Sequence, residues 1–186
     1  MQVNDLGLGG VVEIIPKKFG DARGFFSETY QRQRFLDAGI TQDWMQDNQS
    51  FSAEKGTLRG LHFQVAPVAQ DKLIRVLKGA IFDVAVDIRN GSPTYGKWVS
   101  CELSAEKFNQ LLIPRGFAHG FLTLVPDVEV LYKVSAPYSP ECDRGVRWND
   151  PAIGVAWPLE PGQQPVLSGK DAQAPMLADI ASQITF

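Results

Sequence analysis

The stretch Ile81-Phe82-Asp83-Val84-Ala85-Val86-Asp87-Ile88 alternates in the manner of a β-strand, because large apolar residues occupy every second position. Two acids, Asp83 and Asp87, fall between them and would share the opposite face. Carboxylates on one strand face most often meet solvent. They also suit the interior of a barrel in which polar groups form a site. Lys72, on the preceding strand, presents the same two alternatives, and the sequence leaves both open.

Short apolar or alternating runs recur from end to end, separated by glycine, proline and asparagine. This pattern indicates an antiparallel sandwich or barrel. Helix is scarce: one is predicted over residues 31–38, with Gly39 as its C-terminal cap, and another after Pro175. The further predicted strands cover residues 11–15, 73–77, 98–103, 110–113, 117–125 and 128–134.

The composition predicts one domain over residues 1–186, because the only proline-rich stretch, residues 158–165, leaves too little chain after it for a second. Lysine and arginine total 18 against 21 acids, without a basic cluster, which argues against a nucleic-acid surface. Cys101 and Cys142 are isolated, as in reduced cytosolic proteins. Neither a signal peptide nor a membrane-length apolar run is found, so we expect a soluble cytoplasmic protein without membrane contact.

The chain has only two histidines, and each lies among glycines and aromatic residues. His62 belongs to Arg59-Gly60-Leu61-His62-Phe63-Gln64, which lies between predicted strands, and His119 belongs to residues 114–121. Imidazole titrates near neutral pH, so the two segments together suggest proton chemistry. For either histidine alone, a hydrogen-bonded structural role is the commoner outcome.

Several segments, in order, resemble the deoxysugar nucleotide 3,5-epimerases that act on dTDP-4-dehydro-6-deoxyglucose in dTDP-rhamnose synthesis. The resemblance covers nearly the whole chain and implies a cupin-type jelly-roll barrel, mainly β and antiparallel, with a few short helices. It also implies a homodimer formed by strand exchange near the N-terminus. The matching segments are residues 19–28, 46–50, 58–64, 82–89, 114–121, 131–133, 143–151 and 167–171.

The resemblance implies four catalytic residues. His62 would be the general base, with Asp171 orienting its imidazole, although Asp83 remains a rival for that role. Tyr132 would be the acid on the opposite face of the sugar, although ordinary strand packing also explains a tyrosine there. Lys72 would lie near the keto oxygen and stabilise the enolate.

The resemblance also implies a substrate-binding set. Arginine suits a diphosphate because its planar fork grips two oxygens at once. Tyr138 matches an aromatic residue that stacks on thymine, and Phe26 would add an apolar wall beside the sugar. Asp143 stands where many relatives carry glutamate. The whole implied set is Arg23, Phe26, Glu28, Gln46, Asp47, Asn48, Arg59, His119, Tyr138, Asp143 and Lys170.

The reaction needs no redox cofactor, and the sequence predicts no metal site. A metal-dependent cupin is the main competitor, because Pro114-x-Gly116-x-x-His119 matches half of its usual signature. The other half, a His-x-His pair, is missing because Phe63 and Gln64 follow His62. A binding jelly roll without activity, and relatives that epimerise only C3 or C5 or isomerise the keto group, remain alternatives.

Overall fold

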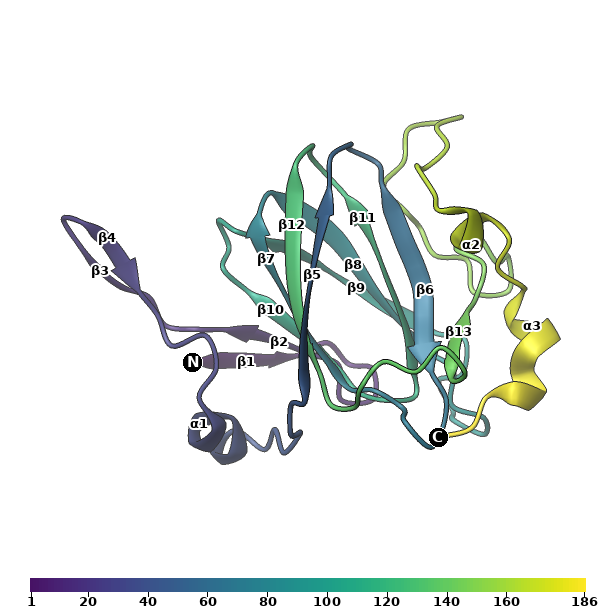
Figure 1. Ribbon diagram of the computed structural model, residues 1–186, viewed down its shortest axis with the longest axis horizontal. Coiled ribbons are helices and arrows are strands. Elements are labelled where there is room, and N and C mark those ends of the chain that lie inside the picture. The colour runs from purple at the N-terminus through teal and green to yellow at the C-terminus, as the bar shows by residue number, and fades with distance from the viewer.

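Two antiparallel sheets form the body of the protein in a computed structural model that describes all 186 residues. One sheet has six strands in the order β1-β2-β10-β7-β12-β5, and the other has five in the order β13-β6-β11-β8-β9 (Figure 1). Neighbouring strands are mostly distant in sequence, and the predicted jelly-roll barrel is confirmed. The strands of these sheets are β1 (Gln2–Asp5), β2 (Val12–Ile15), β5 (Gln46–Ser52), β6 (Leu58–Gln64), β7 (Lys72–Lys78), β8 (Ala80–Asp87), β9 (Trp98–Ser104), β10 (Gln110–Ile113), β11 (Phe117–Thr123), β12 (Val128–Val134) and β13 (Asp143–Gly145).

The alternation along β8 places its two faces in different environments. Ile81 and Ala85 belong to the core between the sheets, and Asp83, of the same parity, is fully buried there. Val84 and Val86 pack on the other face, where residues 146–186, the C-terminal segment, cover the smaller sheet. Asp83 therefore lies in the barrel interior, which decides between the two alternatives that the sequence left open.

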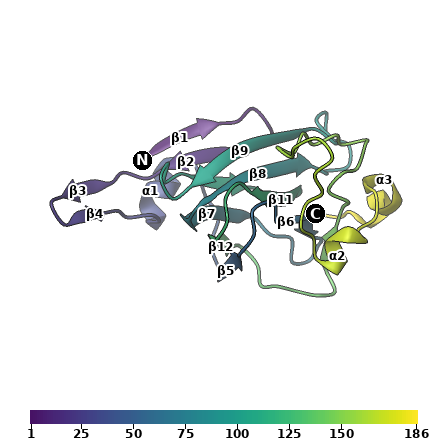
Figure 2. The ribbon, with the colours of Figure 1, turned by 90° about the horizontal axis from the view of Figure 1, so that it is seen from above.

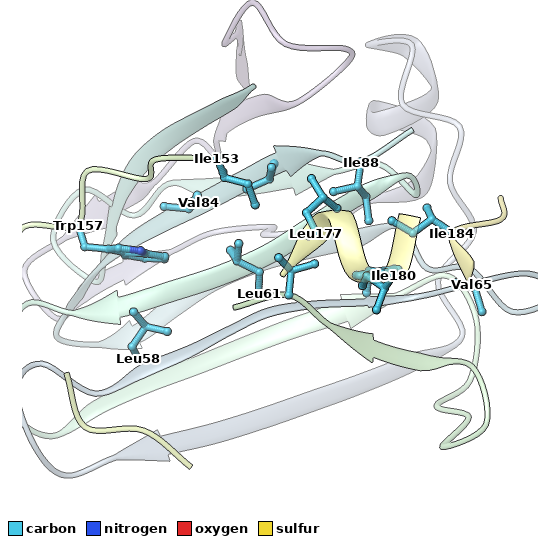
Figure 3. Close-up of a cluster of buried hydrophobic side chains, with 14 of the residues drawn as sticks. Leu58, Leu61, Val65, Val84, Ile88, Ile153, Trp157, Leu177, Ile180 and Ile184 are labelled. Carbon is cyan, nitrogen blue, oxygen red and sulfur yellow. The ribbon is translucent and has the colours of Figure 1, made fainter. Parts of the chain in front are cut away.

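The C-terminal segment is held on the smaller sheet by apolar contacts. Leu58 and Leu61 of β6 meet Trp157, Leu177 and Ile180 in one buried cluster (Figure 3). Burying such side chains contributes roughly 1.5–3 kcal/mol each. This packing fixes two short helices, α2 (Gly169–Ala172) and α3 (Leu177–Ile180), beside β6 and β13, and a 3₁₀ turn, Ala181–Gln183, follows.

Helix α1 (Arg32–Asp37) confirms the helix predicted over residues 31–38. The side chain of Gln31 accepts a hydrogen bond from the Arg34 amide at its start, and Gly39 takes a φ of +80° after its end. Phe35 packs against Ile14 on the outer face of the larger sheet. This helix therefore covers part of the larger sheet, opposite the C-terminal segment.

Strands β3 (Phe19–Asp21) and β4 (Gly24–Phe26) form a hairpin whose residues are all exposed. The hairpin extends from the body at the end opposite to α2 and α3 (Figures 1 and 2). It belongs to neither main sheet. Nothing in the sequence pattern predicted a hairpin here, because three-residue strands carry little periodicity.

Other strands differ from expectation in a way that matters for the site. His62 lies within strand β6, and not between two strands as its glycine-rich surroundings suggested. Strand β5 alternates between half-buried and exposed residues, and all of them except Phe51 are polar, so it lacks the apolar signal of a strand. No helix of the structure is long and apolar enough to cross a membrane.

Candidate active site

A bulge in β6 decides which side chains enter the barrel. Arg59 pairs with Phe121 of β11, and His62 pairs with His119. Between these two pairs β6 therefore has one more residue than β11. Residues three apart on a regular strand would point to opposite faces. Here Arg59 and His62 line the same cavity. Gly60 makes this possible, because a Cβ on it would lie 2.5 Å from Cα of Gly120.

His62 and Asp171 form a close pair. Nε2 of His62 lies 2.5 Å from Oδ1 of Asp171, whose side chain is buried. Burial opposes ionisation of this carboxyl, but hydrogen bonds from His62, Ser168 and the Gly60 backbone hold its pKa below the usual range. An ionised carboxylate in this position fixes the imidazole and stabilises its protonated form. The geometry thus pairs His62 with Asp171, and not with Asp83.

Two adjoining cavities of about 280 and 290 Å³ open on His62, Lys72 and Tyr132, all of which line both. Their other walls are polar, which suits a sugar bearing charged groups. The first cavity is further lined by Gln46, Asn48, Phe63, Gln64, Gln70, Tyr138 and Asp143, and the second by Ser50, Arg59, His119, Phe121, Ser168, Lys170 and Asp171.

Lys72 begins strand β7 with its side chain buried. Its Nζ donates a hydrogen bond of 3.2 Å to the carbonyl oxygen of His62. Burial lowers the pKa of Lys72 to about 8, although the carboxylates of Asp143 and Asp83 oppose this shift. The amine therefore remains charged at neutral pH and titrates within a range that an enzyme assay reaches.

Tyr132, on β12, is half-buried and faces the same space. Burial raises the pKa of its phenol, while the charge of Arg59 lowers it and that of Asp143 raises it. The net rise keeps the hydroxyl protonated at neutral pH. A protonated phenol beside a guanidinium can donate a proton and leave a phenolate that the cation stabilises.

His119 is paired with Asp83 at the floor of the site. Its Nε2 lies 2.8 Å from Oδ1 of Asp83, and both side chains are buried. Burial raises the pKa of Asp83 and lowers that of His119, so it favours the uncharged form of each. The second carboxyl oxygen, Oδ2, has no hydrogen-bond partner. Of the two carboxylates considered for His62, Asp83 thus serves the other histidine.

Residues expected at the nucleotide end line both cavities, with Tyr138 and Asp143 in the first and Lys170 in the second. The phenol of Tyr138 donates to Oδ2 of Asp143 at 3.2 Å, and Lys170 forms an ion pair with the same oxygen. The ring of Tyr138 remains more than half exposed. Gln46 and Asn48 are hydrogen-bonded to each other on the adjoining wall.

Four expected residues lie elsewhere in this chain. Arg23 pairs with Asp21 and Glu28 with Arg34, both outside the cavities at His62. Phe26 lines a separate cavity of about 630 Å³ between the hairpin and the larger sheet. The side chain of Asp47 points to the opposite face of β5 from its neighbours and binds Lys133. The side chain of Asp47 therefore lines neither cavity in this chain, and its contact with the substrate stays a prediction.

Sequence reasoning missed Gln64, Gln70 and Ser168, which line the cavities or support their residues. Gln64 follows His62 by two positions, so strand parity could have placed it on the same face. Ser168 accepts a hydrogen bond from the Asp171 amide at the start of α2, a spacing typical of an N-cap. No three His, Cys, Asp or Glu side chains lie close enough together to hold a metal ion.

A family model described as dTDP-4-dehydrorhamnose 3,5-epimerase matches residues 5–179. A relative with that name from Sinorhizobium fredii is 53% identical, covering 97% of this chain and 91% of its own. The epimerase of Bacillus anthracis, crystallised with TDP and PPi bound, has a TM-score of 0.90 at 48% identity, covering 94% of this chain and 98% of its own. The dTDP-6-deoxy-D-glucose-3,5-epimerase of Legionella pneumophila, in complex with dTDP-4-keto-L-rhamnose, has a TM-score of 0.93 at 44% identity, covering 100% and 98%.

Proposed function

The chain belongs to the dTDP-4-dehydrorhamnose 3,5-epimerase family, and from this premise we propose how its own residues carry out the reaction. The protein is an epimerase that converts dTDP-4-dehydro-6-deoxy-D-glucose to dTDP-4-dehydro-L-rhamnose. The observation that supports this mechanism is that His62, paired with Asp171, shares its cavities with Lys72 and Tyr132. A base, a cation and a protonated phenol thus meet in one polar space.

The keto group at C4 acidifies the protons on C3 and C5, so inversion begins with removal of one of them. His62 accepts this proton, and the ionised Asp171 stabilises the resulting imidazolium. The charge that develops on the keto oxygen is stabilised by the ammonium of Lys72. Tyr132 then delivers a proton to the opposite face, and Arg59 stabilises its phenolate until the proton is restored. The sequence of steps uses no redox cofactor and no metal.

The nucleotide would extend from the first cavity, lined by Tyr138, to the second, lined by Lys170 and Arg59. Tyr138 offers an exposed ring for thymine, while Lys170 and Arg59 place positive charge near the diphosphate. The Bacillus anthracis relative binds TDP, and the Legionella pneumophila relative binds a dTDP sugar. We assign the same class of ligand to this chain.

A homodimer would complete the site. Arg23, Phe26 and Glu28 belong to or follow the projecting hairpin, and none of them lines the cavities at His62 in its own chain. Phe25 and Phe26 are exposed by 57% and 68%, which is costly for aromatic residues in water. Insertion of the hairpin into a partner would bury these rings and bring Arg23 and Glu28 to the partner's substrate.

The reaction would take place in the cytoplasm, as a step of dTDP-L-rhamnose synthesis for cell-surface polysaccharide. The two cysteines, Cys101 and Cys142, are free, which fits a reducing compartment. Neither cysteine lines the cavities at His62, and the proposed proton transfer uses neither thiol.

Proton NMR of the chelator-treated protein with dTDP-4-dehydro-6-deoxy-D-glucose in D₂O tests the function. We expect deuterium at both C3 and C5 and formation of the L-lyxo product. Exchange at one carbon alone would indicate a single-site epimerase or a ketoisomerase, and activity that returns only with added metal would indicate a metal-dependent enzyme.

The acid is tested with Tyr132→Phe in the same assay. We expect solvent exchange to persist while inversion is lost, because His62 can still remove and return a proton on one face. A variant that inverts as well as the parent would exclude Tyr132 as the acid. The matched control is Tyr30→Phe, because Tyr30 packs against Phe35 outside the barrel interior.

A further inference from the structure

The short segment Ser135–Ser139, which carries Tyr138, is held mainly by glutamine side chains. Gln70 donates to the carbonyl of Ala136 at 2.8 Å, and Gln46 accepts from the amide of Tyr138 at 3.1 Å. Ser135, at its start, is bonded through its hydroxyl to Asp71 at 2.7 Å. The main chain of this segment, which lies outside the sheets, is therefore hydrogen-bonded to side chains and not to a neighbouring strand.

Gln64 makes the most contacts with this segment. Its Oε1 accepts from the amide of Ser139 at 2.8 Å, and its Nε2 donates to the carbonyl of Pro137 at 3.1 Å. The same Nε2 donates to the carbonyl of Val68 at 2.7 Å. Gln64 therefore binds the chain on both sides of Tyr138, and it is only 3% exposed. A buried amide with both ends satisfied is a rigid connection.

We propose that Gln64 is a positioning residue that holds Tyr138 in the orientation required for nucleotide binding. The inference rests on the proposed function, in which Tyr138 stacks on the base. Tyr138 is 57% exposed, so core packing does not orient its ring. Its phenol donates to Asp143, and the place from which the ring reaches this carboxylate is set by the main chain at residues 137–139, which Gln64 binds directly. A ring that is already held before binding reduces the entropic cost of ordering it when the nucleotide binds.

The position of Gln64 couples the nucleotide end to the catalytic strand. Gln64 lies two residues after His62 on β6, and both side chains line the first cavity. In a metal-dependent jelly roll this position would carry the second histidine of a His-x-His pair. An amide replaces a metal ligand here, and its donor and acceptor ends match a carbonyl and an amide of the Tyr138 segment.

The test is a double-mutant cycle on dTDP binding, measured by titration calorimetry with Gln64→Met, Tyr138→Ala and the double variant. Methionine keeps the volume of glutamine and removes all three hydrogen bonds. We expect Gln64→Met to weaken dTDP binding about tenfold, and to have little further effect once Tyr138 is alanine. Tyr138→Ala alone should weaken binding about tenfold or more, as expected for the loss of base stacking.

Asn90→Leu is the matched control. Asn90 also donates from one amide nitrogen to two main-chain carbonyls, those of Ala181 and Ile184, but it lines neither cavity. Its substitution should leave the dTDP affinity unchanged. If Gln64→Met fails to fold, Gln64→Glu carries the cycle, because it keeps the acceptor for Ser139 and loses the donors to Pro137 and Val68.

Three outcomes overturn the inference in distinguishable ways. An unchanged dTDP affinity in Gln64→Met shows that Gln64 does not position the binding residue. If Gln64→Met weakens dTDP binding by the same factor in the parent and in Tyr138→Ala, Gln64 acts through a group other than Tyr138. A parent protein that does not bind dTDP contradicts the proposed function itself, and the inference with it.

Discussion

The barrel interior and the β3–β4 hairpin each carry residues expected at one active site, yet they hold them in opposite ways. In the interior, His62, Asp171 and Lys72 are oriented by hydrogen bonds and burial within one chain. In the hairpin, Arg23 is almost fully exposed and has only the neighbouring Asp21 as its partner. The interior is thus preorganised by its own fold, whereas the hairpin would become part of a site only against a second surface, as in the proposed homodimer.

The largest effect is expected from removing the base in the interior. His62→Ala should lower deuterium exchange at both C3 and C5 about 10³-fold or more, because one base serves both carbons. Binding of dTDP should be nearly unchanged, since Tyr138 and Lys170 remain in place. Rapid NMR sampling and calorimetry measure the two quantities. Exchange that survives at one carbon would show that a second base exists.

Substituting alanine for one glycine in each region compares how much space each region leaves for a side chain. Gly60 and Gly24 have similar φ angles, +131° and +135°, so alanine meets a similar backbone cost at each. An added Cβ at Gly60 would lie 2.7 Å from the carbonyl oxygen of His119, whereas at Gly24 it meets nothing within 4 Å. Gly60→Ala should therefore destabilise the fold by about 1–3 kcal/mol more than Gly24→Ala. Urea unfolding measures this, and equal losses would contradict the close approach at Gly60.

The titration of Lys72, in the barrel interior, predicts how activity and stability change with pH. Its pKa is lowered to about 8, so kcat should be about tenfold lower near pH 9 than near pH 7, as the ammonium is lost. Stability should not follow this fall. Because the pKa in the fold lies below the unfolded value, the unfolded chain binds more protons, and this group's contribution to stability rises with pH between about 8 and 10.5.

Lys72→Arg is the control for this pH dependence. Its guanidinium stays charged across the range, so the fall in kcat near pH 8 should disappear. A pH profile with the same alkaline fall in this variant would assign that fall to another group.

Mixed dimers test whether the hairpin of one chain contributes Arg23 to the site of its partner. The recovered activity is the smallest effect expected here. Equal amounts of His62→Ala and Arg23→Ala chains, co-expressed, should recover about a quarter of the parent activity, because half of the dimers contain one complete site. His62→Ala mixed with Tyr132→Phe is the matched control, since both residues come from the same chain's interior and no site is complete. Equal activities of the two mixtures would show that Arg23 acts within its own chain.

Much of the site was predictable because its residues carry strong local signals. The alternation along residues 81–88 predicted a strand, and the residues around His62, Tyr132 and Lys72 matched a family pattern. The sequence could not show that Asp171, and not Asp83, pairs with His62, because 109 positions separate the two partners. It also assigned Asp47 with Gln46 and Asn48, whereas strand parity sends the side chain of Asp47 to the other face.

Strand periodicity alone indicated an antiparallel sandwich or barrel, and the family resemblance carried by residue identity implied the jelly roll and the groups available for proton transfer. Which of these groups meet depends on the three-dimensional fold. The bulge at Gly60 turns Arg59 and His62 to one face, and the packing of the C-terminal segment on β6 brings Asp171 to His62. Both depend on contacts between segments far apart in the chain, which no local pattern of residues encodes.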